Sequence, residues 1–215
     1  MTDILFLKKK KILANRTIDI KIKGKIFKDT DILIKYFEGE RLAQVCKEGC
    51  LNYGQKWSCP PYASPFLRIV EKYSYAFMLV FSTQMKYYWD VKNKYLAVKA
   101  ANATLKTTIE KCTRDLETYM KGYSLLSGSC RQCKPCQCKK GLPCKHPDKM
   151  RYSMEAAGLN VQRLTIDFLD HELLWYKDKT LPEYTSTATL ILFNQDLDLD
   201  NLAKILEESV RKNIG

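Results

Sequence analysis

The residues with the clearest chemistry are five cysteines that fall within fifteen positions, from Cys130 to Cys144. Three of them, Cys130, Cys133 and Cys136, recur at every third residue, so one tight loop can turn successive thiolates toward a single point. A [4Fe–4S] cubane cluster is held by such a run together with a fourth cysteine farther along the chain, and Cys144 is the expected fourth ligand. Zinc is the alternative, because four-cysteine zinc sites are also common, although structural zinc usually takes two separated C-x2-C pairs.

A second group of cysteines precedes this loop. Cys46 and Cys50 are spaced to lie one helical turn apart, and Cys59 follows in a Cys-Pro-Pro segment that must be a loop. Three cysteines leave two possibilities: a [4Fe–4S] cluster with one unprotected iron, or a site completed by Cys138, Cys112 or a ligand other than cysteine. The alternative without metal is two buried thiols and one loop cysteine.

The remaining candidates have simpler interpretations. The total of nine cysteines is odd, which favours metal ligation over disulfide pairing. Cys112 falls on the apolar stripe of a long helix, so we expect a core thiol. His146 is expected to be a surface or capping residue, and His171 to be structural. With two histidines in the chain, proton transfer would depend on a tyrosine or on a carboxylate such as Glu155.

Composition indicates a cytoplasmic protein with enough apolar residues for a core. Hydrophobic residues make up 46% of the 215 residues and charged residues 28%. The longest apolar run is too short to cross a membrane, and lysines 8–11 follow the first apolar run, whereas a secretory signal places its charge first. The formal charge is +12, which two four-cysteine clusters would reduce to roughly +8. The lysines are spread along the chain, which disfavours a nucleic-acid partner and suits an acidic redox partner or an anionic substrate.

Hydrophobic periodicity predicts the elements that position these residues. Helices are expected from residue 30 or 31 to about 39, after Ser64-Pro65, over 91–121, from Pro147 to Gly158 and over 199–212. Strands are expected over 16–28, as one strand or as a hairpin bent at Gly24, and over 75–82, 123–126, 164–168 and 187–193. The helix after Pro147 would direct the positive end of its dipole toward the cluster.

This order of elements predicts an α/β (α+β) fold. We expect a single domain over residues 1–215, with a mixed β-sheet, flanking helices, and two cysteine-rich cluster-binding loops at 46–62 and 128–147. The run at 75–82 is apolar on both faces, which is typical of a central strand. No repeat or linker divides the chain.

Two motifs resemble a family of predicted metal-binding proteins, a domain of unknown function found in anaerobic bacteria and methanogenic archaea. One is the Cys46-x3-Cys50 pair with the following Tyr-Gly-x2-Trp-Ser-Cys-Pro-Pro segment. The other is the loop from Gly128 to Pro147, followed by Arg-x-Ser-Met-Glu-Ala-x-Gly at 151–158. The resemblance implies metal binding. It also implies that Cys130, Cys133, Cys136 and Cys144 are the recurring loop cysteines and that Cys138 is an extra.

Three functions remain open. The first is electron transfer by one or two [4Fe–4S] clusters to a redox partner protein in anaerobic metabolism, because full thiolate coordination leaves iron no open position. The second is an enzyme whose Cys46/Cys50/Cys59 cluster uses an open iron as a Lewis acid or sulfur acceptor for a small anionic or sulfur-containing substrate, as in desulfidases or dehydratases. The third is a zinc-binding regulatory module. The sequence contains no Ser-His-Asp set, phosphate loop, dinucleotide glycine motif or C-x3-C-x2-C radical motif.

Overall fold

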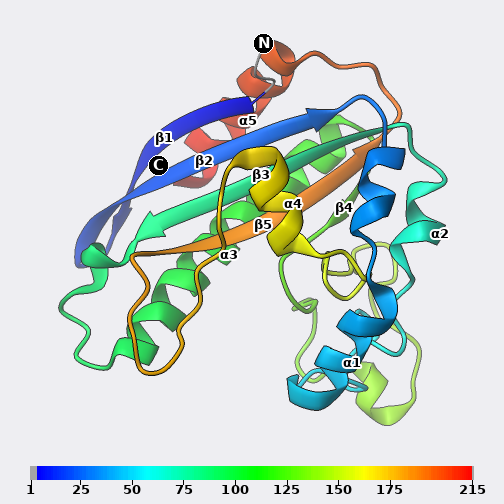
Figure 1. Ribbon diagram of the computed structural model, residues 1–215, viewed down its shortest axis with the longest axis horizontal. Helices are drawn as coiled ribbons and strands as arrows, with labels where there is room; N and C mark the ends of the chain where they lie inside the picture. The colour runs from blue at the N-terminus through cyan, green and yellow to red at the C-terminus, as the bar shows by residue number, and fades with distance from the viewer. Residues whose placement is uncertain (1–3, 215) are drawn as a thin grey trace.

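The computed structural model describes residues 4–214, which form one five-stranded antiparallel sheet with helices on both faces (Figure 1). The strand order is β1-β2-β3-β5-β4. The strands are β1 (Ile4–Leu13), β2 (Arg16–Phe27), β3 (Tyr75–Gln84), β4 (Tyr123–Leu125) and β5 (Tyr184–Phe193). The α-helices are α1 (Gly39–Gly49), α2 (Phe66–Val70), α3 (Lys94–Tyr119), α4 (Val161–Leu169) and α5 (Leu199–Ile214). Short 3-10 helices are η1 (Asp31–Tyr36), η2 (Met85–Tyr88) and η3 (Gln137–Lys140).

Each face of the sheet has its own hydrophobic core. On one face, the isoleucines of β2 and alternate residues of β3 and β5 pack against α3 and α5. On the other face, the intervening residues of β3 and β5 pack against η1, α2, α4 and the turns at 154–159. Because both faces are covered, β3 is apolar at almost every position, as expected for the central strand. The α+β class and the strand at 75–82 are therefore confirmed.

Five features differ from the sequence predictions. Every pairing between the five strands is antiparallel, where a mixed sheet was expected. Strand β1 contains the lysines 8–11 and was not predicted, because four consecutive lysines interrupt its apolar residues; such charge is tolerated on an edge strand. The hairpin turns at residues 14–15, and Gly24 lies inside β2, where a Cβ would stand 2.9 Å from the ring of Phe77.

The other two differences concern the region around the second motif. Residues 164–168 belong to helix α4 rather than to a strand; the buried Val161, Leu164 and Leu169 follow the helical period, and the Asn160 side chain caps the first turn by accepting from the backbone N–H of Arg163. Residues 147–158 form turns rather than a helix, because Leu126 exchanges backbone hydrogen bonds with residues 152 and 154. No helix dipole therefore points at the cysteines from this segment.

The two cysteine-rich segments lie together at one end of the molecule. Helix α1 and the yellow-green loop that contains η3 are neighbours there, away from the centre of the sheet (Figure 1). Strand β4 leads directly into this loop, as predicted. None of the helices within residues 4–214 combines the length and the apolar character needed to cross a bilayer.

Candidate metal centre

Helix α1 and the loop after it present the first three cysteines. Cys46 lies in the last turn of α1, and Cys50 follows the helix directly, with its backbone N–H bonded to the Cys46 carbonyl at 3.1 Å. Cys59 lies in the next turn and is 6% exposed, whereas Cys46 is partly buried and Cys50 is exposed. The predicted spacing of one helical turn between the first two thiols is confirmed.

These three cysteines line one pocket of about 410 Å³. Its other walls come from α3, from the N-terminal half of β5, and from the loops at 127–129, 153–156 and 173–175. Among the side chains on these walls are Lys106 of α3, Glu155, and the serines 127, 129, 153 and 186. The pocket therefore combines soft sulfur ligands with an ammonium, a carboxyl and hydroxyl groups.

Burial dominates the electrostatics of this pocket. It raises the pKa of the Cys46 and Cys59 thiols, and the neighbouring Cys50 raises both further. Burial likewise raises the pKa of the Glu155 carboxyl, against a smaller lowering by Lys106. Three thiolates here would repel one another, so the anionic form of the group needs a bound cation for compensation.

The second group includes Cys136, a loop cysteine whose pKa is lowered. Burial opposes this change, but the nearby backbone of Cys138 and of Trp57 and the side chain of Cys133 lower the pKa of the Cys136 thiol. Cys133 is close enough to Cys136 and Cys130 that both raise the pKa of its own thiol, which burial also raises. Cys130 and Cys136 are thus near enough to Cys133 to affect its pKa, and the surroundings of Cys136 favour its thiolate form.

The other two loop cysteines differ from each other. Cys144, the expected fourth ligand, is partly exposed, and within residues 4–214 no hydrogen bond connects its sulfur to another cysteine. Cys138 is 8% exposed, and its thiol donates to the Gly54 carbonyl at 3.8 Å. Cys138 therefore fastens the second loop to the first, while Cys112 is fully buried between helices, as predicted for a core thiol.

Lys56 and Ser58 connect the two cysteine groups, and the sequence did not indicate this role. The Lys56 ammonium donates to the Ser129 hydroxyl and to the Cys130 carbonyl, both at 2.9 Å. The Ser58 hydroxyl accepts from the Cys130 backbone N–H at 3.0 Å and lies 3.9 Å from the Cys59 sulfur. Both residues lie inside the first motif, next to the more conspicuous Trp57, whose indole N–H donates to the Leu142 carbonyl at 2.9 Å.

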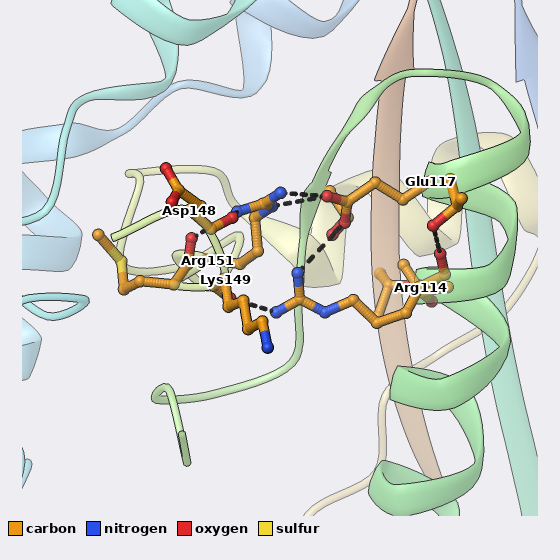
Figure 2. A network of polar contacts seen from close by, with 10 residues as sticks. Arg114, Glu117, Asp148, Lys149 and Arg151 are labelled. Atoms are coloured by element: carbon orange, nitrogen blue, oxygen red, sulfur yellow. Dashed lines mark hydrogen bonds and ion pairs between the residues drawn. The ribbon is translucent and has the colours of Figure 1, made fainter. Parts of the chain in front are cut away.

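A buried ion-pair network fixes the segment that follows the second loop (Figure 2). Glu117 of α3 is 7% exposed and accepts from the guanidinium groups of Arg151 and Arg114 and from the Ser124 hydroxyl. The two arginines also bind main-chain carbonyls of this segment, at Asp148 and Lys149. The chain that leaves the cysteine loop is thereby attached to the longest helix.

The donors of the two groups are thiolates, which zinc and iron–sulfur clusters both use. Within residues 4–214, no three His, Cys, Asp or Glu side chains are grouped so as to hold one metal ion. A cubane cluster takes each thiolate on a different iron and so needs its ligands around a space. Cys46, Cys50 and Cys59 line such a space, and their chemistry fits a cluster.

Comparison with known proteins identifies the family. The family model described as predicted metal-binding protein (DUF2284) matches residues 33–193, which include both cysteine groups and extend from η1 to the end of β5. The chain belongs to this family. Membership supports metal binding and specifies no metal. No curated protein and no solved structure matches this chain.

Proposed function

We propose that this protein of the DUF2284 family is an iron–sulfur protein that binds two [4Fe–4S] clusters and takes part in electron transfer. The loop cluster would be held by four thiolates and the pocket cluster by three. The proposed ligands of the loop cluster are Cys130, Cys133, Cys136 and Cys144. Those of the pocket cluster are Cys46, Cys50 and Cys59. Such clusters supply one-electron chemistry at potentials that depend on hydrogen bonds to the sulfurs.

The observation that carries this proposal is the environment of Cys136. The backbone of both cysteine loops, at Cys138 and at Trp57, lowers the pKa of its thiol although burial opposes this. Backbone N–H donors aimed at a cysteine sulfur stabilise the thiolate and are one of the means by which proteins set the reduction potential of a cluster. A structural core thiol such as Cys112 has the opposite character, since burial raises its pKa to about 11.

The connection between the two groups supports a redox role. Lys56 and Ser58, which closely precede Cys59, both hydrogen-bond to Cys130, so the two clusters would be neighbours. The Lys56 ammonium also lowers the pKa of both Cys59 and Cys136 as a minor contribution, and would offset part of the negative charge of the reduced clusters. A four-thiolate loop cluster would exchange electrons with a partner protein, and the pocket cluster would receive or supply them internally.

The pocket favours a second candidate, an enzyme with an open iron. The three-cysteine cluster would lack a protein thiolate at one iron. The pocket of about 410 Å³ around it is lined by polar side chains that could bind a substrate. A small substrate would bind that iron as it would bind a Lewis acid. The two candidates are compatible, because the loop cluster can supply electrons to the pocket cluster.

Anaerobic purification with iron and sulfide analysis, followed by EPR of the reduced protein, tests both candidates. About eight irons with a signal that added thiol leaves unchanged supports electron transfer alone, and a signal that thiol perturbs supports the open iron. One stoichiometric zinc with no visible absorption refutes the iron–sulfur proposal in favour of a zinc module.

A further inference from the structure

Lys106 is the cation of the three-cysteine pocket. It lies on α3, and its side chain is 21% exposed. Burial lowers the pKa of its ammonium, and the nearby Arg131 and Lys56 lower it further, while Glu110 and, to a lesser extent, Glu155 raise it. Because Lys106 is partly buried near two other cations, an anion bound beside it would stabilise its charged form.

The contacts of Lys106 leave its hydrogen-bonding capacity largely unused. Its ion pair is with Glu110, one turn along α3, at 3.8 Å, which is too long for a hydrogen bond. Glu110 is in addition bonded to Arg131 at 2.5 Å. Within residues 4–214 the ion pairs of Lys106 do not include Glu155, although both line the pocket. An ammonium has three donors, so Lys106 can bind a ligand without giving up a strong contact.

The backbone beside Lys106 leaves room for this ammonium. Gly128 has a φ of +67°, and a Cβ at this position would stand 2.8 Å from the Lys106 Nζ. The glycine thus permits the turn that starts the second cysteine loop and also lets Lys106 reach the pocket wall. Ser127 and Ser129, on either side of it, line the same pocket.

We propose that Lys106 is the anion-binding residue of the pocket, and that the ligand is a small organic acid that binds with its carboxylate on Lys106 and its reactive end at the three-cysteine centre. This inference rests on the open-iron candidate above. The pocket joins a hard cation to a soft centre, so it selects for a molecule with an anionic oxygen group and a sulfur or oxygen donor separated by a short chain. Leu173 and Trp175 supply apolar surface for that chain.

The test compares thiols that end in a carboxylate with thiols of the same chain length that end in an uncharged alcohol. The anaerobically purified, cluster-loaded protein is titrated with mercaptoacetate and 3-mercaptopropionate, and with the uncharged 2-mercaptoethanol and 3-mercapto-1-propanol of matching length, while EPR follows the reduced clusters. We expect a mercaptocarboxylate to perturb the signal at about tenfold lower concentration than its alcohol, which is the effect of one partly screened charge-assisted hydrogen bond. Added salt should reduce this preference.

Variants on the same helix identify the residue. Lys106→Met should abolish the preference for the carboxylate while both thiols still perturb the signal, and Lys106→Arg should keep most of it. Lys111→Met is the control, because Lys111 is on α3 but lines other pockets; it should leave the preference unchanged. Equal binding of acid and alcohol in the unmodified protein, or equal losses in the two Met variants, overturns the assignment to Lys106. A signal that no thiol perturbs refutes the open iron itself, and the inference with it.

Discussion

The buried Glu117 network gives a prediction whose size follows from its contacts. Replacing Glu117 by Gln keeps the volume of the side chain and removes its charge. Arg151, whose side chain is 13% exposed, would then lose its charged partner, and the Ser124 hydroxyl would face an amide instead of a carboxylate. The other arginine contributes less, since Arg114 is 29% exposed and 3.5 Å away from the carboxylate.

The expected loss is about 3 kcal/mol in the free energy of unfolding. Removing one partner of a buried pair typically costs roughly 3–5 kcal/mol, because the other charge stays buried without compensation. The lower end of that range applies here, because Arg151 keeps its hydrogen bonds to the carbonyls of Asp148 and Met150. The segment after the second cysteine loop should also loosen, so the variant should lose metal faster to a chelator than the unmodified protein.

Urea denaturation under anaerobic conditions measures the first effect, and the rate of metal release to a chelator measures the second. Glu110→Gln is the matched control, since Glu110 is on the same helix and also pairs with an arginine but is 20% exposed. This control should cost less than about 1 kcal/mol. A Glu117→Gln variant within about 1 kcal/mol of the unmodified protein, or no less stable than the control, would refute the reasoning.

Three further predictions separate metal ligands from structural residues. Cys136→Ala should remove about half of the bound iron, whereas Cys138→Ala should keep all of it and lose only a weak contact between the loops, as iron and sulfide analysis would show. Cys112→Ala should leave the iron content unchanged and lower the free energy of unfolding by roughly 1 kcal/mol, measured by denaturation; iron loss would contradict its role as a core thiol. His171 should destabilise the fold at low pH: burial and, to a lesser extent, Lys23 lower its pKa to about 4, so the unfolded chain takes up a proton that the folded chain does not as the pH falls below about 6.5. The unmodified protein should lose roughly 1–2 kcal/mol more stability than His171→Gln between pH 6.5 and 4 in paired denaturation curves, and equal losses would contradict the assignment.

Hydrophobic patterns predicted the long or fully buried elements well. The central strand β3 and the helix α3 are apolar over many residues, so their patterns could not be mistaken. Short segments were less secure, because five residues of α4 satisfy a strand pattern and a helix pattern equally, and the period becomes clear only with Val161 and Leu169 included. The lysines of β1 obscured its strand pattern in the sequence, because this strand is stabilised by its pairing with β2 rather than by its own apolar residues.

The cysteine spacing predicted that Cys46 and Cys50 lie one helical turn apart, but not what surrounds the thiols. Trp57 and Ser58 meet the second loop more than seventy positions away in the sequence, and nothing local to either motif indicates that meeting. Lys106 is one of several lysines on a long helix, and only the fold shows that it lines the pocket instead of pointing into solvent. The prediction of a helix after Pro147 was wrong for the same reason. Hydrogen bonds from this segment to Leu126 and Glu117, which are distant in the sequence, determine its conformation.

The way the pocket is assembled has a consequence for biosynthesis. Its thiols are translated first, in residues 46–59, but its opposite wall is residues 186–188 of β5, which leave the ribosome well over a hundred residues later. In the interval Cys46, Cys50 and Cys59 have neither the wall nor the contacts of Lys56 and Ser58 with residues 129–130 to shield them. The pocket proposed to hold a metal centre is therefore complete only after β5 is synthesised, and until then the nascent chain carries three thiols open to oxidation.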